Sequence, residues 1–206
     1  MKRRYSIVES LLIGLLLLLC SAQVAGSQPR VTLAGESRLW IEGSSSVNTF
    51  VCVAGAVDGA GSFSAQRPAG AHVAEAELLV PVRGFDCGKA RMNKDFVAAL
   101  KVEAHPQIRF RLNEAELTAS ANDAGWGHLR VTGRLTIAGT ERTVTMHVKG
   151  QRSADGTYRA TGELPLLMSD FGIDPPTALF GLIKAHDPIT VRFDLVAIPQ
   201  SDYYTN

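Results

Sequence analysis

The chain has 206 residues, of which 46% are hydrophobic and 20% are charged, and its formal net charge is +1. This composition is typical of a globular protein, and the length suits one domain or at most two. Lysine and arginine are spread along the chain and form no basic stripe, so the sequence gives no support for a nucleic-acid-binding protein.

The first 26 residues have the layout of a secretory signal peptide. Three basic residues at positions 2–4 precede an apolar run over residues 11–19, and small residues follow. The apolar run is shorter than the roughly 20 residues that a membrane-spanning helix needs. Cleavage after Ala22 or after Gly26 fits the small residues, and a lipoprotein modified at Cys20 is the alternative. We therefore expect an exported bacterial protein, periplasmic or secreted, with no stable membrane span after signal cleavage.

From residue 31 onward, apolar and polar residues alternate with the period of two that is typical of half-buried β-strands. The first three predicted strands carry apolar residues of one parity at Val31, Leu33, Leu39 and Ile41, then at Val47, Val51, Val53 and Val57, and then at Leu78, Val80 and Val82. The second strand can extend to Phe63, and a turn rich in Gly, Pro and Ala follows it at residues 67–71.

One segment has a helical period instead. Met92, Phe96 and Leu100 are four residues apart, as on one face of an α-helix. Asn93 is a suitable N-cap, and the residue before Pro106 disfavours the helical conformation. We predict one short helix, over residues 93–101, between the third and fourth strands.

The fourth predicted strand changes parity part of the way along. Ile108, Phe110 and Leu112 share one face, and Ala115 and Leu117 continue that face after a shift of one residue. One extra residue near positions 113–114 produces such a shift, so we predict a β-bulge there.

Four more strands complete the pattern. Residues 138–140 form a tight hairpin turn between the fifth and sixth strands, and Asp155-Gly156 is a strong turn signal after the sixth. The apolar faces of these strands lie at Leu129, Val131, Leu135 and Ile137; at Val144, Met146 and Val148; at Tyr158, Ala160, Leu164, Leu166 and Met168; and at Ile189, Val191, Phe193 and Leu195.

Eight strands with one apolar face each must bury those faces together, in a sandwich or in a closed barrel. A barrel also removes exposed sheet edges. An eight-stranded barrel has an interior that side chains fill or that holds one small ligand. We therefore predict an all-β fold, an eight-stranded antiparallel barrel.

Four stretches of the chain resemble the YceI-like family, whose members are exported lipocalin-like barrels associated with polyisoprenoid or other lipid binding. These stretches are residues 42–52 (EGSSSVNTFVC), 81–101, 105–110 and 133–146. The resemblance covers residues 31–198 and implies a domain over residues 27–200, between the signal peptide (1–26) and a C-terminal tail (201–206). Asn48 and Thr49 depart from the pattern, because one branch of the family often has His and Asp there.

If the signal is removed beyond Cys20, two cysteines remain, Cys52 and Cys87. An even pair of cysteines in an oxidising compartment is typically bonded, so we predict a disulfide between them. A reactive thiol at Cys87 is the alternative, although no His is close in sequence and no Cys-X-X-Cys motif is present.

The resemblance implies an isoprenoid-type ligand in the barrel lumen. The candidate ligand-binding residues are those of the shared apolar face, together with apolar residues of the segment 169–187, which is too long for a hairpin turn. They are Val51, Val53, Leu78, Val80, Ile108, Phe110, Leu135, Ile137, Val144, Met146, Leu164, Leu166, Phe171, Ile173, Phe180, Ile183 and Phe193. The segment 169–187 either plugs the barrel or borders a portal. In the alternative interpretation, the same side chains simply fill a dry core in a non-catalytic structural or interaction module.

Other classes of function have little support. The five histidines show no metal-ligand spacing, and no nucleophile elbow or phosphate-binding glycine loop occurs, so we predict no metal, no cofactor and no catalytic residues. An outer-membrane barrel has aromatic girdles and a polar interior, whereas aromatic residues make up only 7% of this chain. We expect a binding or carrier protein for an apolar isoprenoid or fatty lipid; the oligomeric state does not follow from the sequence.

Overall fold

The structure, a computed structural model, describes residues 30–63, 71–72, 74–120, 125–178 and 182–200. The predicted signal peptide, the C-terminal tail and Phe180 lie outside these residues.

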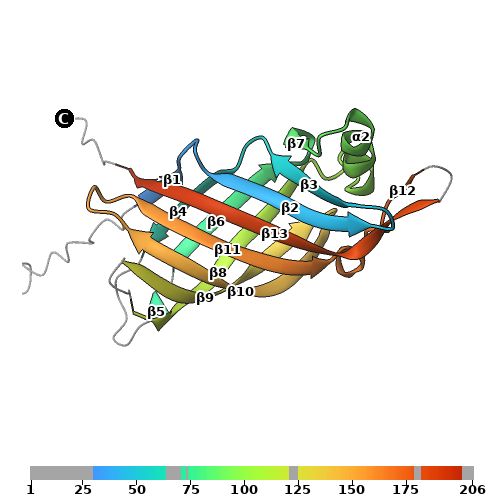
Figure 1. Cartoon of the computed structure of the whole chain (residues 1–206). Coiled ribbons are helices and arrows are strands. Elements are labelled where there is room, and N and C mark those ends of the chain that lie inside the picture. Colours follow the sequence, from blue (N-terminus) through green and yellow to red (C-terminus); the bar gives the residue numbers. More distant parts are fainter. Residues whose placement is uncertain (1–29, 64–70, 73, 121–124, 179–181, 201–206) are drawn as a thin grey trace, which may run out of the picture.

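The described residues form a closed barrel of eight antiparallel staves (Figure 1). A stave here is one position in the barrel wall, which is occupied by a single strand or by two strands that follow one another along the same line. Each stave pairs with the next, and β13 pairs with β1 to close the ring. In ring order the strands are β1 (Arg30–Leu33), β4 (Asp58–Phe63), β6 (Ala74–Pro81), β8 (Gln107–Ala119), β9 (Trp126–Ile137), β10 (Thr140–Arg152), β11 (Tyr158–Leu167) and β13 (Ile183–Pro199). The predicted eight-stranded antiparallel barrel is confirmed.

Two staves are interrupted, which is why the chain has more strands than staves. β1 continues after a turn as β2 (Arg38–Ser45), and both pair with β13. β3 (Thr49–Ala54) pairs with β2, and β4 continues that stave after a break at residues 55–57. Three short strands add to the sheet: β5 (Ala71–His72) beside β8, β7 (Phe85–Asp86) beside β3, and β12 (Thr177–Ala178) beside β13.

Two local features that the sequence predicts are present. The β8–β9 register shifts between Leu112 and Glu114, which confirms the predicted bulge. The turn from β9 to β10 has positive φ at both Ala138 (48°) and Gly139 (82°). A two-residue turn with positive φ at both positions matches the twist of the strands that it joins.

The helix α2 (Ala90–Ala99) lies at one end of the barrel, but it begins three residues earlier than predicted (Figure 1). Its N-cap is Lys89, so the prediction of Asn93 as the cap is wrong. Asn93 instead lies inside the helix, where its Oδ1 accepts a hydrogen bond from the Cys87 N–H (2.7 Å) and its Nδ2 donates to Asp86 (3.1 Å). Its side chain therefore ties the helix back to the preceding segment.

The apolar core is concentrated towards the α2 end of the barrel. Its larger cluster includes residues from η1 (Val82–Gly84), the end of α2 and η2 (Met168–Phe171) as well as from the staves. Its buried members are Val82, Leu100, Val102, Leu135, Ile137, Ala138, Met146, Val148, Leu164, Met168, Phe171 and Ile173. Phe171 and Ile173 are only 2% and 5% exposed. The first part of the segment 169–187 is therefore packed into the barrel end.

An aspartate on β13 anchors η2. Asp187 accepts hydrogen bonds from the Ser169 N–H (2.8 Å) and from the Ser169 hydroxyl (2.5 Å). These bonds hold the pKa of the Asp187 carboxyl below its ordinary value of 3.8. The carboxylate therefore stabilises the fold above that value, and the contribution is lost as the pH falls through the lowered pKa of the folded state.

We expect Asp187→Asn to lower the thermal unfolding midpoint at neutral pH and to have little effect at pH values well below 3.8, where the native carboxyl is also protonated. Thermal melts of both proteins across this pH range check the expectation. Asp174→Asn, at an exposed position of the same segment, is the matched control. An equal loss at neutral and acidic pH would show that the charge of Asp187 is not what anchors η2.

Candidate functional site

The barrel encloses a cavity of about 1470 Å³. Cavities that hold drug-sized ligands measure roughly 300–1,000 Å³, so this one exceeds the usual range for such ligands. Its lining on β9 extends from Gly127 to Ile137, ten residue steps. At a rise of ~3.4 Å per residue and a strand tilt of ~40°, these steps correspond to about 25 Å along the barrel axis. The cavity therefore extends along nearly the whole length of β9.

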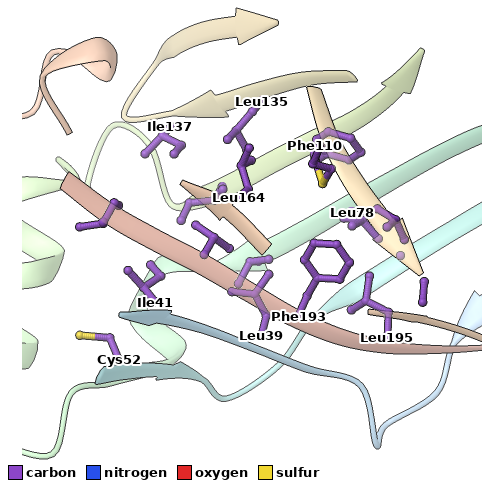
Figure 2. A pocket seen from close by; sticks show the side chains of 18 of the residues that line it. Leu39, Ile41, Cys52, Leu78, Phe110, Leu135, Ile137, Leu164, Phe193 and Leu195 are labelled. Carbon is purple, nitrogen blue, oxygen red and sulfur yellow. The ribbon is translucent and has the colours of Figure 1, made fainter. Parts of the chain in front are cut away.

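The lining is predominantly apolar and comes from many strands. Figure 2 shows side chains of β2, β3, β6, β8, β9, β11 and β13 around the cavity, with Phe110 and Phe193 among them. The charged residues of the lining are Glu75, Lys89, Arg91, Asp95, Arg152 and Arg159. They lie near the barrel ends: Glu75, Arg152 and Arg159 near the end where β13 finishes, and the others on or beside α2. The middle of the cavity is thus apolar.

Most of the predicted ligand-binding residues line this cavity. They are Leu78, Val80, Ile108, Phe110, Leu135, Ile137, Met146, Leu164, Phe171, Ile173, Ile183 and Phe193. Val144 and Leu166 do not line it. They pack against the larger core cluster and border a smaller depression that also includes Glu42 and Ser44.

The prediction that Val51 and Val53 face the interior is wrong. Their side chains are 48% and 47% exposed, whereas Cys52 between them is 1% exposed. Cys52 pairs with Ile41, which is buried, so the even-numbered residues of β3 point inward. The segment from Phe50 to Ala54 is apolar on both faces, so the alternation could not select the inner one.

Several lining residues were not among the predicted site residues. Phe50 of β3 faces the cavity, as do Met92 and Phe96 of α2. The four-residue spacing of the two helical residues marks an apolar face, but it does not show that this face covers a cavity. Lys89 and Arg91, at the start of α2, add two basic groups to the same end.

The outer wall of the barrel is polar, and ion pairs cross its strands. Arg192 of β13 contacts Glu42 of β2 (2.9 Å) and Glu163 of β11 (2.5 Å). The Trp40 indole N–H and Arg192 both hold the pKa of Glu42 below its ordinary value. Exposed pairs of this kind contribute little to stability. Their position shows that the polar face is outside and the apolar face inside, the reverse of an outer-membrane barrel.

The predicted disulfide is present and lies beside the cavity. Cys52 and Cys87 are bonded, with their Cα atoms 4.0 Å apart, and both residues line the cavity. The bond joins β3 to the segment that leads into α2. Phe85 and Phe96 add a ring contact, with centroids 4.9 Å apart. Together with the Asn93 hydrogen bonds, these contacts hold α2 over the barrel end.

Within the described ranges, no three His, Cys, Asp or Glu side chains gather closely enough to hold a metal ion. In that same part of the chain, no helix has both the length and the apolar character needed to cross a bilayer.

A closed eight-stranded barrel with a long apolar cavity has an interior that can hold one small ligand. The sequence profile of the YceI-like domain matches residues 35–197, so the chain belongs to the YceI-like family. No protein with a curated functional description matches the sequence.

Two of the solved structures that share the fold align with most of this chain. BcnA of Burkholderia cenocepacia superposes with a TM-score of 0.62 at 23% identity, over 79% of this chain and 96% of that one. A polyisoprenoid binding domain from Saccharophagus degradans, implicated in plant cell wall breakdown, also superposes with a TM-score of 0.62, at 15% identity, over 82% of this chain and 98% of that one. At these identities the likeness shows the fold alone.

Proposed function

We propose that this protein is an exported carrier that holds one long apolar lipid, an isoprenoid or a fatty chain, in the barrel lumen and performs no catalysis on it. The observation that carries the proposal is the cavity of about 1470 Å³, whose middle is lined by apolar side chains from many strands. A purely structural barrel would fill this space with its own side chains. The polyisoprenoid binding domain with the same fold supports the ligand class.

Burial of an apolar chain supplies enough free energy for binding. Each methylene removed from water contributes about 0.8 kcal/mol, so ten of them contribute about 8 kcal/mol. Association and ordering of the chain offset part of this gain. Several kcal/mol remain without any polar anchor, which suits a lumen with its charged groups at the ends.

The α2 end of the barrel is the proposed entrance. Val47, at the tip of the β2–β3 hairpin, lines the cavity and is also 65% exposed, so apolar surface continues from the lumen to the rim. Leu182, just before β13, is 80% exposed. The two segments are joined by a hydrogen bond from the Ser46 N–H to the Lys184 carbonyl (2.9 Å). They therefore form one continuous rim beside α2 (Figure 1).

Native mass spectrometry of the protein purified from its own host tests the proposal. We expect a bound species whose mass is recovered as a neutral or weakly polar lipid after solvent extraction. The extracted protein should bind an added fatty acid, and this should raise its thermal unfolding midpoint. A protein that carries no lipid and also fails to take up fatty acids would contradict the carrier function.

The localisation of the protein belongs to the same proposal. The signal-like segment at residues 1–26 supports export to the periplasm, with lipidation at Cys20 as the alternative. The disulfide fits an oxidising compartment. Mass determination of the mature N-terminus distinguishes cleavage after Ala22, cleavage after Gly26 and a lipidated Cys20.

A further inference from the structure

Three phenylalanines of the lumen pack against glycines of neighbouring strands. A Cβ atom added to Gly43 would lie 2.4 Å from Cζ of Phe50. The corresponding distances are 2.4 Å from Gly133 to Phe110 and 2.6 Å from Gly162 to Phe193. Real Cβ atoms do not approach a ring so closely. Each ring therefore occupies the space that the side chain of any residue other than glycine would need at that position.

The strand register explains these contacts. Gly43 pairs directly with Phe50, and Gly162 pairs directly with Phe193. Phe110 is diagonal to Gly133, because Leu112 is the partner of Gly133. All three rings belong to residues that line the cavity. Each aromatic side chain therefore lies in a recess of the wall.

We propose that Gly43, Gly133 and Gly162 set the free width of the lumen and so the length of lipid chain that it accepts. The inference rests on the proposed lipid-carrier function and goes beyond it, because it names the residues that determine chain-length selectivity. A phenylalanine side chain buries roughly 150–250 Å² of surface. A ring of that size, moved off its glycine, projects across the lumen and blocks it at that level.

The recesses lie at different depths. Gly43 and Phe50 are close to the β2–β3 hairpin, at the proposed entrance. Gly162 and Phe193 lie near the middle of β11 and β13 (Figure 2 shows Phe193 inside the lumen). A ring displaced at Gly162 leaves space on the entrance side, which a short chain can occupy and a long chain cannot. A ring displaced at Gly43 obstructs chains of every length.

The surroundings of each glycine determine which substitution is informative. At Gly133 a Cβ would also lie 2.6 Å from the Arg111 carbonyl oxygen, which is backbone and cannot move aside, so a substitution there would disturb the sheet itself. At Gly162 the nearest backbone atom, the His147 carbonyl oxygen, is 3.1 Å away. At Gly43 the three nearest atoms all belong to the Phe50 ring. Gly162 and Gly43 are therefore the positions to change.

The test compares Gly162→Ala with the wild type by calorimetric titration with octanoic acid and with oleic acid. We expect the affinity for oleic acid to fall about tenfold, which corresponds to the loss of roughly two buried methylenes, while the affinity for octanoic acid stays within about twofold. Adding Phe193→Leu to Gly162→Ala removes the displaced ring and should restore oleic acid binding. Gly35→Ala, at an exposed glycine that does not line the cavity and where an added Cβ meets no atom within 4 Å, is the matched control and should keep both affinities.

The positions of the rings give a readout that does not depend on lipid. In the wild type, NMR should show contacts between the Phe193 ring and the Gly162 Hα protons, and in Gly162→Ala this ring should contact side chains across the lumen. If Gly162→Ala does not fold, Gly43→Ala takes its place and should lower the affinity for both acids. Adding Phe50→Leu to Gly43→Ala should then restore both affinities.

The proposal would be overturned if Gly162→Ala lowered the affinity for both acids equally. It would also be overturned if adding Phe193→Leu to Gly162→Ala did not restore oleic acid binding. If the Phe193 ring moves as expected in Gly162→Ala but the wild type binds neither acid, the result would contradict the carrier function while supporting the recess.

Discussion

Replacing Cys52 and Cys87 by alanine should lower the free energy of unfolding by about 4 kcal/mol. The two cysteines are 35 residues apart in the sequence, and the bond removes the loop-closure entropy of that segment from the unfolded state. Both residues are buried, at 1% and 8% exposure, so the bond is also protected from reductants in the folded protein.

Urea unfolding of the double variant, of the oxidised wild type and of the wild type reduced while unfolded measures this effect. The double variant and the reduced protein should unfold at similar, lower urea concentrations. The single variant Cys52→Ala also lacks the bond but loses only one of the two buried side chains, and its Cys87 thiol has no partner with which to re-form the bond. It therefore controls for the loss of a buried side chain. A double variant as stable as the oxidised protein would show that the disulfide does not constrain the unfolded chain.

Loss of the disulfide should affect α2 more than the rest of the barrel. None of the residues of α2 is buried, and the helix is held through the segment that contains Cys87. Hydrogen exchange should therefore increase in α2 of the double variant more than in β9 and β10, whose pairing runs continuously from Thr140–Ile137 to Gln151–Trp126. A uniform increase would indicate general destabilisation instead.

The second large effect is expected from filling the lumen. Val131 of β9 lines the cavity and is half-buried, so Val131→Trp would place an indole in the space that the proposed lipid occupies. We expect the affinity for a fatty acid to fall at least about tenfold, because the indole displaces two or more buried methylenes. The fold should be retained, since the added side chain enters empty space and not a packed core.

Thr132→Trp is the matched control, because Thr132 is the next residue of the same strand and points to the outer wall, where its hydroxyl lies 3.1 Å from that of Thr145. Displacement of a fluorescent fatty acid, with circular dichroism to monitor the fold, gives the comparison. Unchanged binding in Val131→Trp, or equal losses in the two variants, would place the ligand elsewhere than in the lumen.

Features that depend on neighbouring residues followed from the sequence. The β8 bulge is visible because Leu112 and Ala115 cannot share a face without an extra residue. The turn at Ala138-Gly139 is a short-range feature as well. The cysteine pair followed from the count of cysteines and the expected compartment. The start of α2 was missed because a good N-cap residue, Asn93, uses its side chain inside the helix to bind the preceding segment.

Features that depend on the partner strand did not follow. The inner face of β3 was assigned incorrectly because the segment is apolar on both faces, and only its pairing with β2 selects Cys52 over Val51 and Val53. The recess at Gly162 exists only because Phe193, far along the chain, is its partner in the β11–β13 register.

By itself, the sequence determined the all-β class, the eight-stranded barrel, most inward-facing positions and the family resemblance, since a period of two records which side chains share a face. Only the tertiary structure decided that the interior is hollow. The volume of a cavity is what remains after side chains from all staves meet across a closed barrel, and that remainder depends on register and closure between residues far apart in the chain.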